Sequence, residues 1–471
     1  MSSGLTKKVH KMNDNPALDK ATKNGNNRSS RNHPFDADEM EERQMNEQWA
    51  VYQDSKAFAD RVATLYGAGE DVRALQKARY GKLVERFEKR FGAQKGGLCF
   101  FSAPGRTEIG GNHTDHNNGR VLAAAVNLDT IACVSRTDDN VIVVDSEGFA
   151  PITVELDNLD IREKDFGTTL ALIRGTAGIM KEMGYKIGGF RATISSSVLR
   201  GSGLSSSAAF EVLIAAILDG LYNGFVVEAK TRAVIAQKVE NVYFGKPCGL
   251  MDQMASSVGG MVTIDFKEQD AKVEAIACDF AAKGYALCVV NTGGDHGDLT
   301  DDYAAIRKEM EAVAAHFGKH VLREVELETV ESHIGELRRA CGDRAVLRAL
   351  HYYDENARVL EQAAAIRGGD LPAFFDAVKR SGDSSWKLLQ NVYARSTEEQ
   401  MAMGIELSRR FLHGDGAQRV HGGGFAGTIQ AYVPLDRLDD YKKLMEDAFG
   451  PGSCTALMVR PEGAVMMPME G

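Results

Sequence analysis

A glycine- and serine-rich segment at residues 201–208, reading GSGLSSSA, has the composition of a loop that binds phosphate. Glycines allow tight turns that bring successive backbone amides close to a ligand. The apolar spacing from Phe210 to Ile217 predicts a helix directly after the loop, and a helix N-terminus adds unpaired N–H groups and positive partial charge. Serine hydroxyls reach phosphate oxygens or a magnesium ion. The segment predicts a polyphosphate site, and a flexible strand-to-helix connection is the alternative.

This loop differs from a P-loop, because no Gly–Lys pair in the chain is followed by Ser or Thr. Gly245-Lys246, for example, is followed by Pro247. We therefore expect backbone amides and hydroxyls, without a Walker lysine, to hold the phosphates of a nucleotide.

A second segment, residues 103–119, reads APGRTEIGGNHTDHNNG and is expected to be a glycine-rich connection just after a strand. Polar side chains crowded on such a connection indicate ligand contacts. Their mixture of donors and acceptors suits a polyhydroxylated ligand; a metal site and a simple Asx-capped turn are the alternatives. The side chains concerned are Arg106, Glu108, Asn112, His113, Asp115 and His116.

A third segment, residues 239–260, places two acidic residues at the ends of predicted helices. Glu240 lies near the end of one helical pattern, and Asp252 lies in the first turn of the next, where the helix dipole favours an ionised carboxylate. An isolated Asp at this position is usually a cap, so a functional interpretation depends on its partners.

A fourth segment, HGGGFAG at residues 421–427, contains the G-x-G-x-x-G pattern. A dinucleotide fingerprint must open a helix, whereas residues 428–433 read as a strand. The glycines therefore predict a wall that lies close to another loop or to phosphate, and packing against a neighbouring helix is the alternative.

The composition is that of a globular protein with two or three domains: 471 residues, 44% hydrophobic and 26% charged. A formal net charge of -10 disfavours general nucleic-acid binding. The seven scattered cysteines predict reduced thiols and no structural zinc. The chain shows no apolar run of membrane-spanning length and no signal peptide, so we expect a cytoplasmic protein without membrane contact.

The elements that must position these segments follow from periodicity. Residues 1–35 predict a disordered arm, because they contain too little apolar surface to fold, and residues 36–95 predict a helical extension. Strands are expected at 98–101, 121–135, 141–144, 190–196, 261–266 and 286–291, and helices at about 168–184, 206–222, 228–243, 300–316, 344–367, 370–382 and 396–412, before a strand–helix–strand unit at about 417–460.

These segments, in this order, resemble the GHMP kinase superfamily and, within it, the galactokinase family, over roughly residues 95–460. GSGLSSSA matches the phosphate-binding motif and GGGFAG the C-terminal glycine motif. Three features are similar to galactokinases in particular: GR…HTD, KPCGLMDQ and the spacing Asn291…His296…Tyr303.

The resemblance implies an α+β fold of two domains behind the helical extension. Residues 96–290 would form the N-terminal ATP- and sugar-binding domain, with a ribosomal-protein-S5-like domain 2 fold, and residues 291–471 a ferredoxin-like C-terminal domain. The implied activity is transfer of the γ-phosphate of ATP, with Mg²⁺, to the anomeric hydroxyl of galactose. A related sugar such as galacturonate or an N-acetylhexosamine, or a non-catalytic sugar sensor, are the alternatives. The resemblance does not imply an oligomeric state for this protein.

The resemblance also implies roles for single residues. Asp252 would act as the base, and Arg106 would hold it ionised and stabilise the transferring phosphoryl group. Ser207 and Glu240 would carry magnesium. The sugar would be bound by Asn112, His113, Asp115, Gly249 and Tyr303, and the ATP phosphates by Gly201, Gly203, Leu204, Ser205, Ser206 and Ser207.

Four positions depart from the family pattern: Asn112 stands where glutamate is usual, Leu199 where proline is usual, Ala426-Gly427 where a second glycine pair is usual, and Thr169 where a tryptophan would lie beside adenine. We expect the amide of Asn112 to weaken discrimination at the six position of the sugar, so that galacturonate or six-deoxy sugars are better tolerated. The alternative is that a neighbour such as Glu108 supplies the missing carboxylate.

Overall fold

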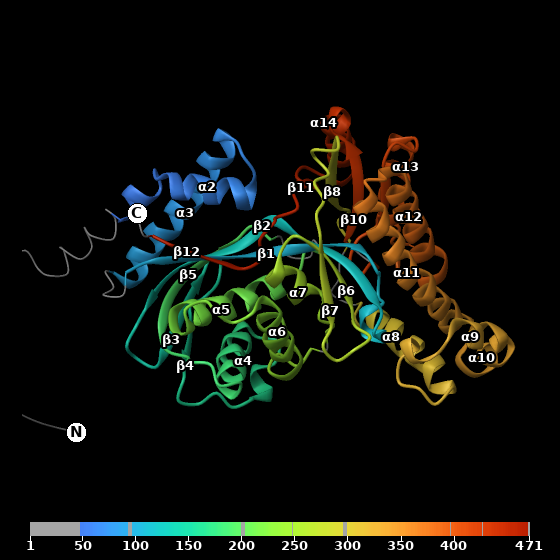
Figure 1. Ribbon diagram of the computed structural model, residues 1–471, viewed down its shortest axis with the longest axis horizontal. Helices are drawn as coiled ribbons and strands as arrows, with labels where there is room; N and C mark the ends of the chain where they lie inside the picture. The colour runs from blue at the N-terminus through green and yellow to red at the C-terminus, as the bar shows by residue number, and fades with distance from the viewer. Residues whose placement is uncertain are drawn as a thin grey trace, which may run out of the picture.

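The computed structural model describes residues 48–92, 97–198, 203–246, 248–294, 299–395, 397–425 and 427–469. The predicted arm at 1–35 and the predicted phosphate ligand Gly201 lie outside these ranges. The described residues form two β-sheets with helices packed on them, an α+β architecture (Figure 1). Within these ranges no helix is long and apolar enough to cross a membrane.

The larger sheet has eight strands, in the order β12-β1-β2-β5-β3-β4, and β6 pairs with both β2 and β7. Most neighbours are antiparallel, but β3 and β5 are parallel. The long strand β2 contacts three partners and is the centre of the sheet. The strands are β1 (Cys99–Gly110), β2 (Arg120–Arg136), β3 (Val141–Ser146), β4 (Ile152–Glu155), β5 (Phe190–Ser196), β6 (Met261–Asp265), β7 (Lys272–Ile276) and β12 (Val465–Pro468).

Helices α2 (Lys56–Tyr66) and α3 (Glu70–Phe91) of the predicted extension lie on one face of this sheet (Figure 1). The Ser55 side chain caps α2 by accepting a hydrogen bond from the Phe58 amide at 3.1 Å. The apolar positions that predicted these helices are buried against side chains of β1 and β2. The extension is therefore an integral layer of the fold.

The opposite face of the sheet carries α4 (Thr169–Glu182), α5 (Ser206–Asn223), α6 (Ala229–Val242) and α7 (Met251–Val258), as Figure 1 shows. The first three agree with the predicted helices to within two residues at each end. Eleven of the 18 residues of α5 are buried. Because its apolar residues occur on all sides, α5 is a central helix that fixes the serine-rich loop before it.

The smaller sheet is wholly antiparallel, with four strands in the order β11-β8-β10-β9. The strands are β8 (Tyr285–Asn291), β9 (Ala417–Val420), β10 (Thr428–Pro434) and β11 (Cys454–Leu457). Helices α8 (Thr300–His316), α9 (Leu327–Ser332), α10 (Ile334–Cys341), α11 (Asp343–Gly368), α12 (Leu371–Ser384) and α13 (Gln400–Leu412) come between β8 and β9, and α14 (Leu438–Phe449) between β10 and β11. This β-α-β-β-α-β order is ferredoxin-like.

Two sequence expectations differ from the structure. Residues 103–110 belong to β1 and pair with β2 through register shifts at Pro104/Arg106 and Glu108/Gly110. The proline and glycines indicated a loop, but β-bulges accommodate them within a strand. In addition, β8 pairs with β10 and β11, although the predicted boundary at 290/291 assigns it to the first domain. We therefore propose a boundary before Tyr285, with β12 returning to the first sheet.

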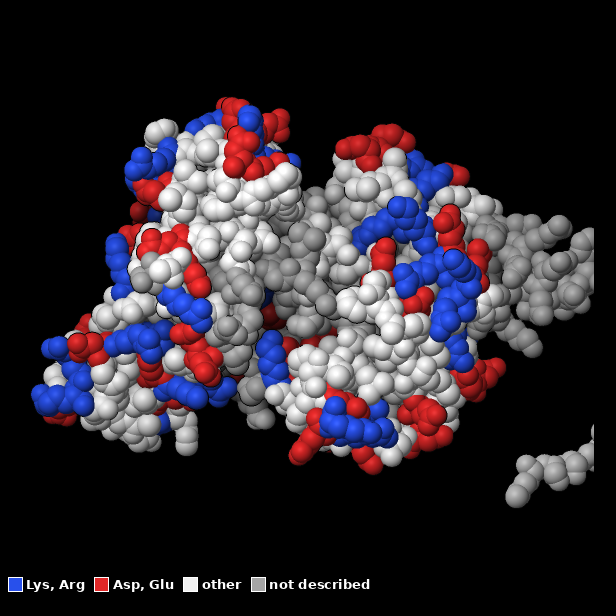
Figure 2. Space-filling view, turned by 180° about the vertical axis from the view of Figure 1, so that it is seen from behind, with Lys and Arg blue, Asp and Glu red and all other residues white. Residues whose placement is uncertain are grey.

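Basic and acidic side chains are interspersed over the described part of the face shown in Figure 2. All seven cysteines lie within the described residues, and all have free thiols, as predicted.

Candidate functional site

The centre of the candidate site is an ion pair between Arg106 on β1 and Asp252 in the first turn of α7, which are 146 residues apart in sequence. Arg106 Nε donates to Asp252 Oδ1 and Nη2 donates to Oδ2, both at 2.7 Å. This two-point contact fixes the carboxylate plane as well as its charge. Burial alone would raise the pKa of Asp252, but the charge and hydrogen bonds of Arg106 outweigh it and lower that pKa below its ordinary value.

The serine-rich loop is bound directly to this ion pair. Arg106 Nη1 donates to the Gly203 carbonyl, and the Arg106 amide donates to the Leu204 carbonyl at 3.0 Å. Ser205 Oγ donates to Asp252 Oδ2 at 2.6 Å. Ser205 was predicted to bind ATP phosphates, yet its hydroxyl is engaged by the carboxylate, and the Leu204 side chain is part of the core. The backbone amides of Leu204 and Ser205 are therefore the groups of these two residues that remain for binding phosphate.

Ser206 and Ser207 begin α5, and Ser205 precedes it in the left-handed conformation with φ 57°. The Ser205 side chain makes no capping hydrogen bond to the helix, because it bonds to Asp252. The first turn of α5 thus keeps amides that an anion would satisfy. The predicted helix start is confirmed, and Ser206 and Ser207 are partly exposed.

The glycine segment at 421–427 lies against the serine-rich loop, as its pattern predicted. A Cβ atom at Gly203, which has φ 68°, would lie 2.7 Å from Thr428 Oγ1 and 2.9 Å from His421 Nδ1. His421 is bonded to Thr107 Oγ1 at 3.0 Å and to Thr428 Oγ1 at 3.1 Å. Close approach of the two segments therefore requires glycine at 203.

Asp115 brings a second carboxylate toward Asp252. Burial, followed by the negative charge of Asp252, raises the pKa of Asp115 to about 6. A Cβ atom at Gly249 would lie only 1.7 Å from Asp115 Oδ2, so the segment before α7 fits against Asp115 only without a side chain. The two predicted sugar ligands Asp115 and Gly249 therefore lie together beside Asp252.

His113 and Tyr303 are both held by backbone carbonyls of the glycine segment. His113, with φ 57°, donates from Nε2 to the Gly423 carbonyl at 2.9 Å, and burial lowers its pKa to about 4. The Tyr303 hydroxyl donates to the Gly424 carbonyl at 2.8 Å, and its ring meets Phe425 edge to face. The neutral imidazole thereby joins residues 103–119 to the glycine segment, and the phenol joins α8 to the same segment.

The expectation that Asn112 reads the six position of a sugar is wrong. Its side chain is 0% exposed and all four of its hydrogen-bonding positions are filled by protein. Nδ2 donates to Glu108 Oε1 at 3.0 Å and to the Gly422 carbonyl at 2.6 Å, and Oδ1 accepts from Ser385 Oγ and Asn391 Nδ2. An amide satisfied on every side inside the protein has no group left for a ligand.

Glu108 does not supply the carboxylate that is missing at Asn112. Its carboxylate is 3% exposed and accepts from Arg419 Nη2 at 2.6 Å. Its partner Arg419 is itself 0% exposed, so this is an internal ion pair that joins β1 to β9. The polar cluster beneath the sugar segment is structural.

Glu240 lies in a group of polar side chains beside α5 and α7. Its Oε2 accepts from Gln253 Nε2 at 2.8 Å, and its Oε1 lies 3.4 Å from Lys246 Nζ. The same Gln253 nitrogen donates to Glu211 Oε2 at 3.3 Å. Burial, and then the charge of Glu240, raise the pKa of Glu211 well above its ordinary value.

The oxygen donors of Ser207 and Glu240 suit Mg²⁺, which commonly takes one or two carboxylates and completes its coordination with substrate phosphates and water. Within the described ranges, no three or more His, Cys, Asp or Glu side chains converge as a metal site. Two protein donors would leave the other coordination positions of Mg²⁺ to phosphate oxygens and water.

Sequence reasoning missed Gln253, Glu211 and Lys246. A signal existed for two of them: Gln253 follows Asp252, and Glu211 stands four residues after Ser207, on the same face of α5. The contacts that join them cross three helices, so periodicity alone did not reveal them.

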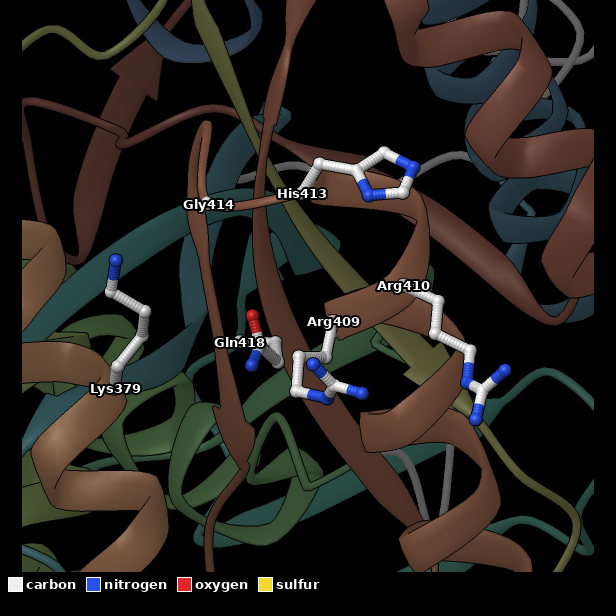
Figure 3. A pocket seen from close by; sticks show the side chains of 6 residues that line it. All are labelled: Lys379, Arg409, Arg410, His413, Gly414 and Gln418. Atoms are coloured by element: carbon white, nitrogen blue, oxygen red, sulfur yellow. The ribbon is translucent and has the colours of Figure 1, made fainter.

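A separate hollow of about 640 Å³ is lined by Lys379, Arg409, Arg410, His413, Gly414 and Gln418. Arg409 and Arg410 both pair with Glu406, and the basic side chains spread around the hollow rather than meeting at one point (Figure 3). None of the predicted site residues lines it.

Comparison with known proteins first defines the class. Residues 171–260 match the family model of the GHMP kinases N terminal domain. A crystal structure of mevalonate kinase superposes with a TM-score of 0.55, at 15% identity, over 76% of this chain and 98% of that chain. The fold is that of the GHMP kinases, and the matched range contains the serine-rich loop.

Closer matches define the family. Residues 85–136 match the galactokinase galactose-binding signature. The galactokinase of Streptomyces coelicolor is 32% identical over 381 residues, which are 80% of this chain and 94% of that protein; that of Haemophilus influenzae is 30% identical over 74% of this chain and 88% of that protein. The Lactococcus lactis galactokinase complexed with galactose superposes with a TM-score of 0.72, at 22% identity, over 82% of this chain and 99% of that chain. The chain therefore belongs to the galactokinase family.

Proposed function

We propose that the protein is a galactokinase, which transfers the γ-phosphoryl group of ATP to the anomeric hydroxyl of galactose. The observation that carries the proposal is the two-point Arg106–Asp252 ion pair, bonded to the serine-rich loop on one side and lying beside Asp115 on the other. This ion pair thus connects the serine-rich loop, which is suited to phosphate, with residues 103–119, which are suited to a sugar.

Asp252 orients the attacking hydroxyl by accepting its hydrogen bond. Arg106 and Ser205 together donate three hydrogen bonds to Asp252, and its pKa is lowered, so it is a weak base that stays ionised. A weak base is sufficient because the transition state of phosphoryl transfer is loose and depends mainly on positioning and charge neutralisation. Arg106 also presents positive charge to the transferred group.

The sugar lies between Asp252 and the segment that carries Asp115 in this proposal. Asp115 accepts hydrogen bonds from the sugar hydroxyls, and the missing side chain of Gly249 leaves the space that the Asp115 carboxylate occupies. His113 and Tyr303 fix the wall of the site through their bonds to Gly423 and Gly424. The buried Asn112 takes no part in binding, so the structure gives no reason to prefer galacturonate.

The nucleotide phosphates lie on the amides of Gly203 to Ser207 and on the N-terminus of α5. Ser207 and Glu240 would hold Mg²⁺, which neutralises charge on the phosphates when it is bound. We place the reaction in the cytoplasm, where the seven free thiols would remain reduced.

The test is ADP release by the full chain with ATP, Mg²⁺ and a panel of galactose, galacturonate and N-acetylgalactosamine. We expect the highest kcat/KM with galactose, and a product phosphorylated at the anomeric position by NMR. Binding of galactose without ADP release would support a sugar sensor instead. Preference for another sugar of the panel would overturn galactose as the substrate but would still support a kinase that phosphorylates a sugar.

A further inference from the structure

A buried carboxylate near the proposed active site lacks the partners that buried charges normally have. Glu211, on α5, is 0% exposed. Its Oε2 accepts one long hydrogen bond from Gln253 Nε2 at 3.3 Å, and its Oε1 has no hydrogen-bond partner among the described residues. Gln253 Oε1 is also buried without a partner among them. Two unsatisfied buried oxygens in adjacent side chains are costly, which indicates that something else satisfies them.

Another acid on the same helix shows what a purely structural solution looks like. Asp219 is likewise 0% exposed, but it accepts from Arg232 Nη1 at 2.9 Å and from the Val227 amide at 3.2 Å. Its charge is balanced within the fold. No cationic side chain is hydrogen-bonded to Glu211 in the described residues.

The surroundings of Glu211 contain the proposed metal ligands. It lies one helical turn after Ser207, so both side chains project from the same face of α5. The Gln253 amide nitrogen bonds to Glu211 Oε2 and to Glu240 Oε2 at the same time. Gln253 therefore holds the two carboxylates side by side.

We propose that Glu211 is a second carboxylate of the divalent-cation site, a positioning residue that acts on the cation through a coordinated water while Gln253 fixes its distance from Glu240. The inference rests on the proposed function, because it requires a cation at Ser207 and Glu240. Mg²⁺ usually keeps several water ligands. The positive charge of the cation would favour the ionised form of Glu211, which accepts a hydrogen bond from such a water. The water would also satisfy the unpartnered Oε1.

The alternative is a neutral network, in which Glu211 carries a proton and donates it to Gln253 Oε1. Glu211→Gln distinguishes the two, because an amide of the same shape retains a donor for the neutral network but removes the charge that acts on the cation. No cationic side chain is hydrogen-bonded to Glu211 in the described residues, so the substitution leaves no buried positive charge without a partner, and this variant should fold. If it does not, Glu211→Met is measured in the same way.

The readout is the factor by which Mg²⁺ tightens binding of a non-hydrolysable ATP analogue, measured by calorimetry on the full chain with and without Mg²⁺. We expect Glu211→Gln to reduce this factor by about fivefold or more, within the usual range of coupling between sites. Its metal-free affinity should stay within about twofold of the natural protein. Asp139→Asn, at a partly exposed ion pair with Arg191 outside the site, is the control and should leave the factor unchanged.

The same measurement on Glu240→Gln separates the role of Glu211 from the proposed metal site itself. If Glu240→Gln lowers the factor and Glu211→Gln does not, the role of Glu211 is wrong and the metal site stands. If neither variant changes the factor, or if the natural protein shows none, the cation is not held here, and the proposed metal site and the role of Glu211 are both wrong; ADP release still tests the proposed activity separately.

Discussion

Asp129→Asn should be among the most destabilising single substitutions in this protein. Asp129, on β2, is 0% exposed and joins the helical extension, the larger sheet and the chain near the C-terminus. Its Oδ1 accepts from Arg79 Nη1 at 2.5 Å, and its Oδ2 accepts from Arg460 Nη1 at 3.1 Å, Tyr66 Oη at 2.6 Å and Ser102 Oγ at 2.5 Å. One carboxylate thus balances two arginines.

The expected loss of unfolding free energy follows from these hydrogen bonds and ion pairs. An amide presents one oxygen, so it retains the bonds of one carboxylate oxygen and turns its N–H groups toward donors at the other. Two guanidinium groups then lose their counter-charge, and Arg460 is itself 0% exposed. Removing one partner of a buried ion pair costs about 3–5 kcal/mol, a large part of the total stability of a domain, about 5–15 kcal/mol.

The pH dependence has a definite sign. Burial alone would raise the pKa of Asp129, but the charges of Arg79 and Arg460 outweigh it and lower that pKa. A carboxylate with a lowered folded pKa stabilises the fold above its unfolded value of about 3.9, and the contribution is lost as the pH falls through the folded value. The natural protein should therefore lose this stability in acid, and the variant should lack that part of the dependence.

The assay is urea unfolding at neutral pH, followed by tryptophan fluorescence and by circular dichroism. Trp49, in the extension, packs edge to face on Phe100 of β1, so its fluorescence reports the contact between the extension and the sheet. Asp139→Asn is the control, because its ion pair with Arg191 is 45% exposed at the aspartate and should contribute about 0–1 kcal/mol. A loss below about 1 kcal/mol for Asp129→Asn would refute the argument that this carboxylate holds the extension on the sheet.

Four further substitutions test the active site. Asp252→Asn should lower kcat by on the order of 100-fold or more while galactose still binds, and near-normal turnover would remove Asp252 from the mechanism. Gly249→Ala should raise the KM for galactose by about tenfold or more, because its methyl group would lie 1.7 Å from Asp115 Oδ2; an unchanged KM would place the sugar elsewhere. Galactose affinity, by calorimetry, should fall by up to about tenfold per pH unit below about 6 as Asp115 gains a proton, and Asp115→Asn should abolish this dependence. Asn112→Glu should lower the melting temperature by about 2 °C or more without changing the ratio of kcat/KM for galactose and galacturonate, since Asn112 is buried; a changed ratio would show that it faces the sugar.

The sequence by itself determined the local features of this protein. The helices at 169–182, 206–223 and 229–242 were predicted to within two residues because their apolar periodicity is a property of the local chain. The serine-rich loop and Asp252 were likewise placed at helix starts, since glycine, serine and aspartate favour such positions for local reasons. Short strands such as β4, β7 and β12 gave no comparable signal, because four or five residues carry too little pattern.

Only the tertiary structure decided which groups meet. The ion pair of Arg106 with Asp252 spans 146 residues, and the sharing of Gln253 by Glu211 and Glu240 joins three helices. The side chain of Asn112, next to two predicted sugar ligands, points into a buried network instead. Residue type states which bonds a side chain is able to make, but the packing of distant elements fixes the direction in which it points. That direction decides whether a polar group serves the site or the fold.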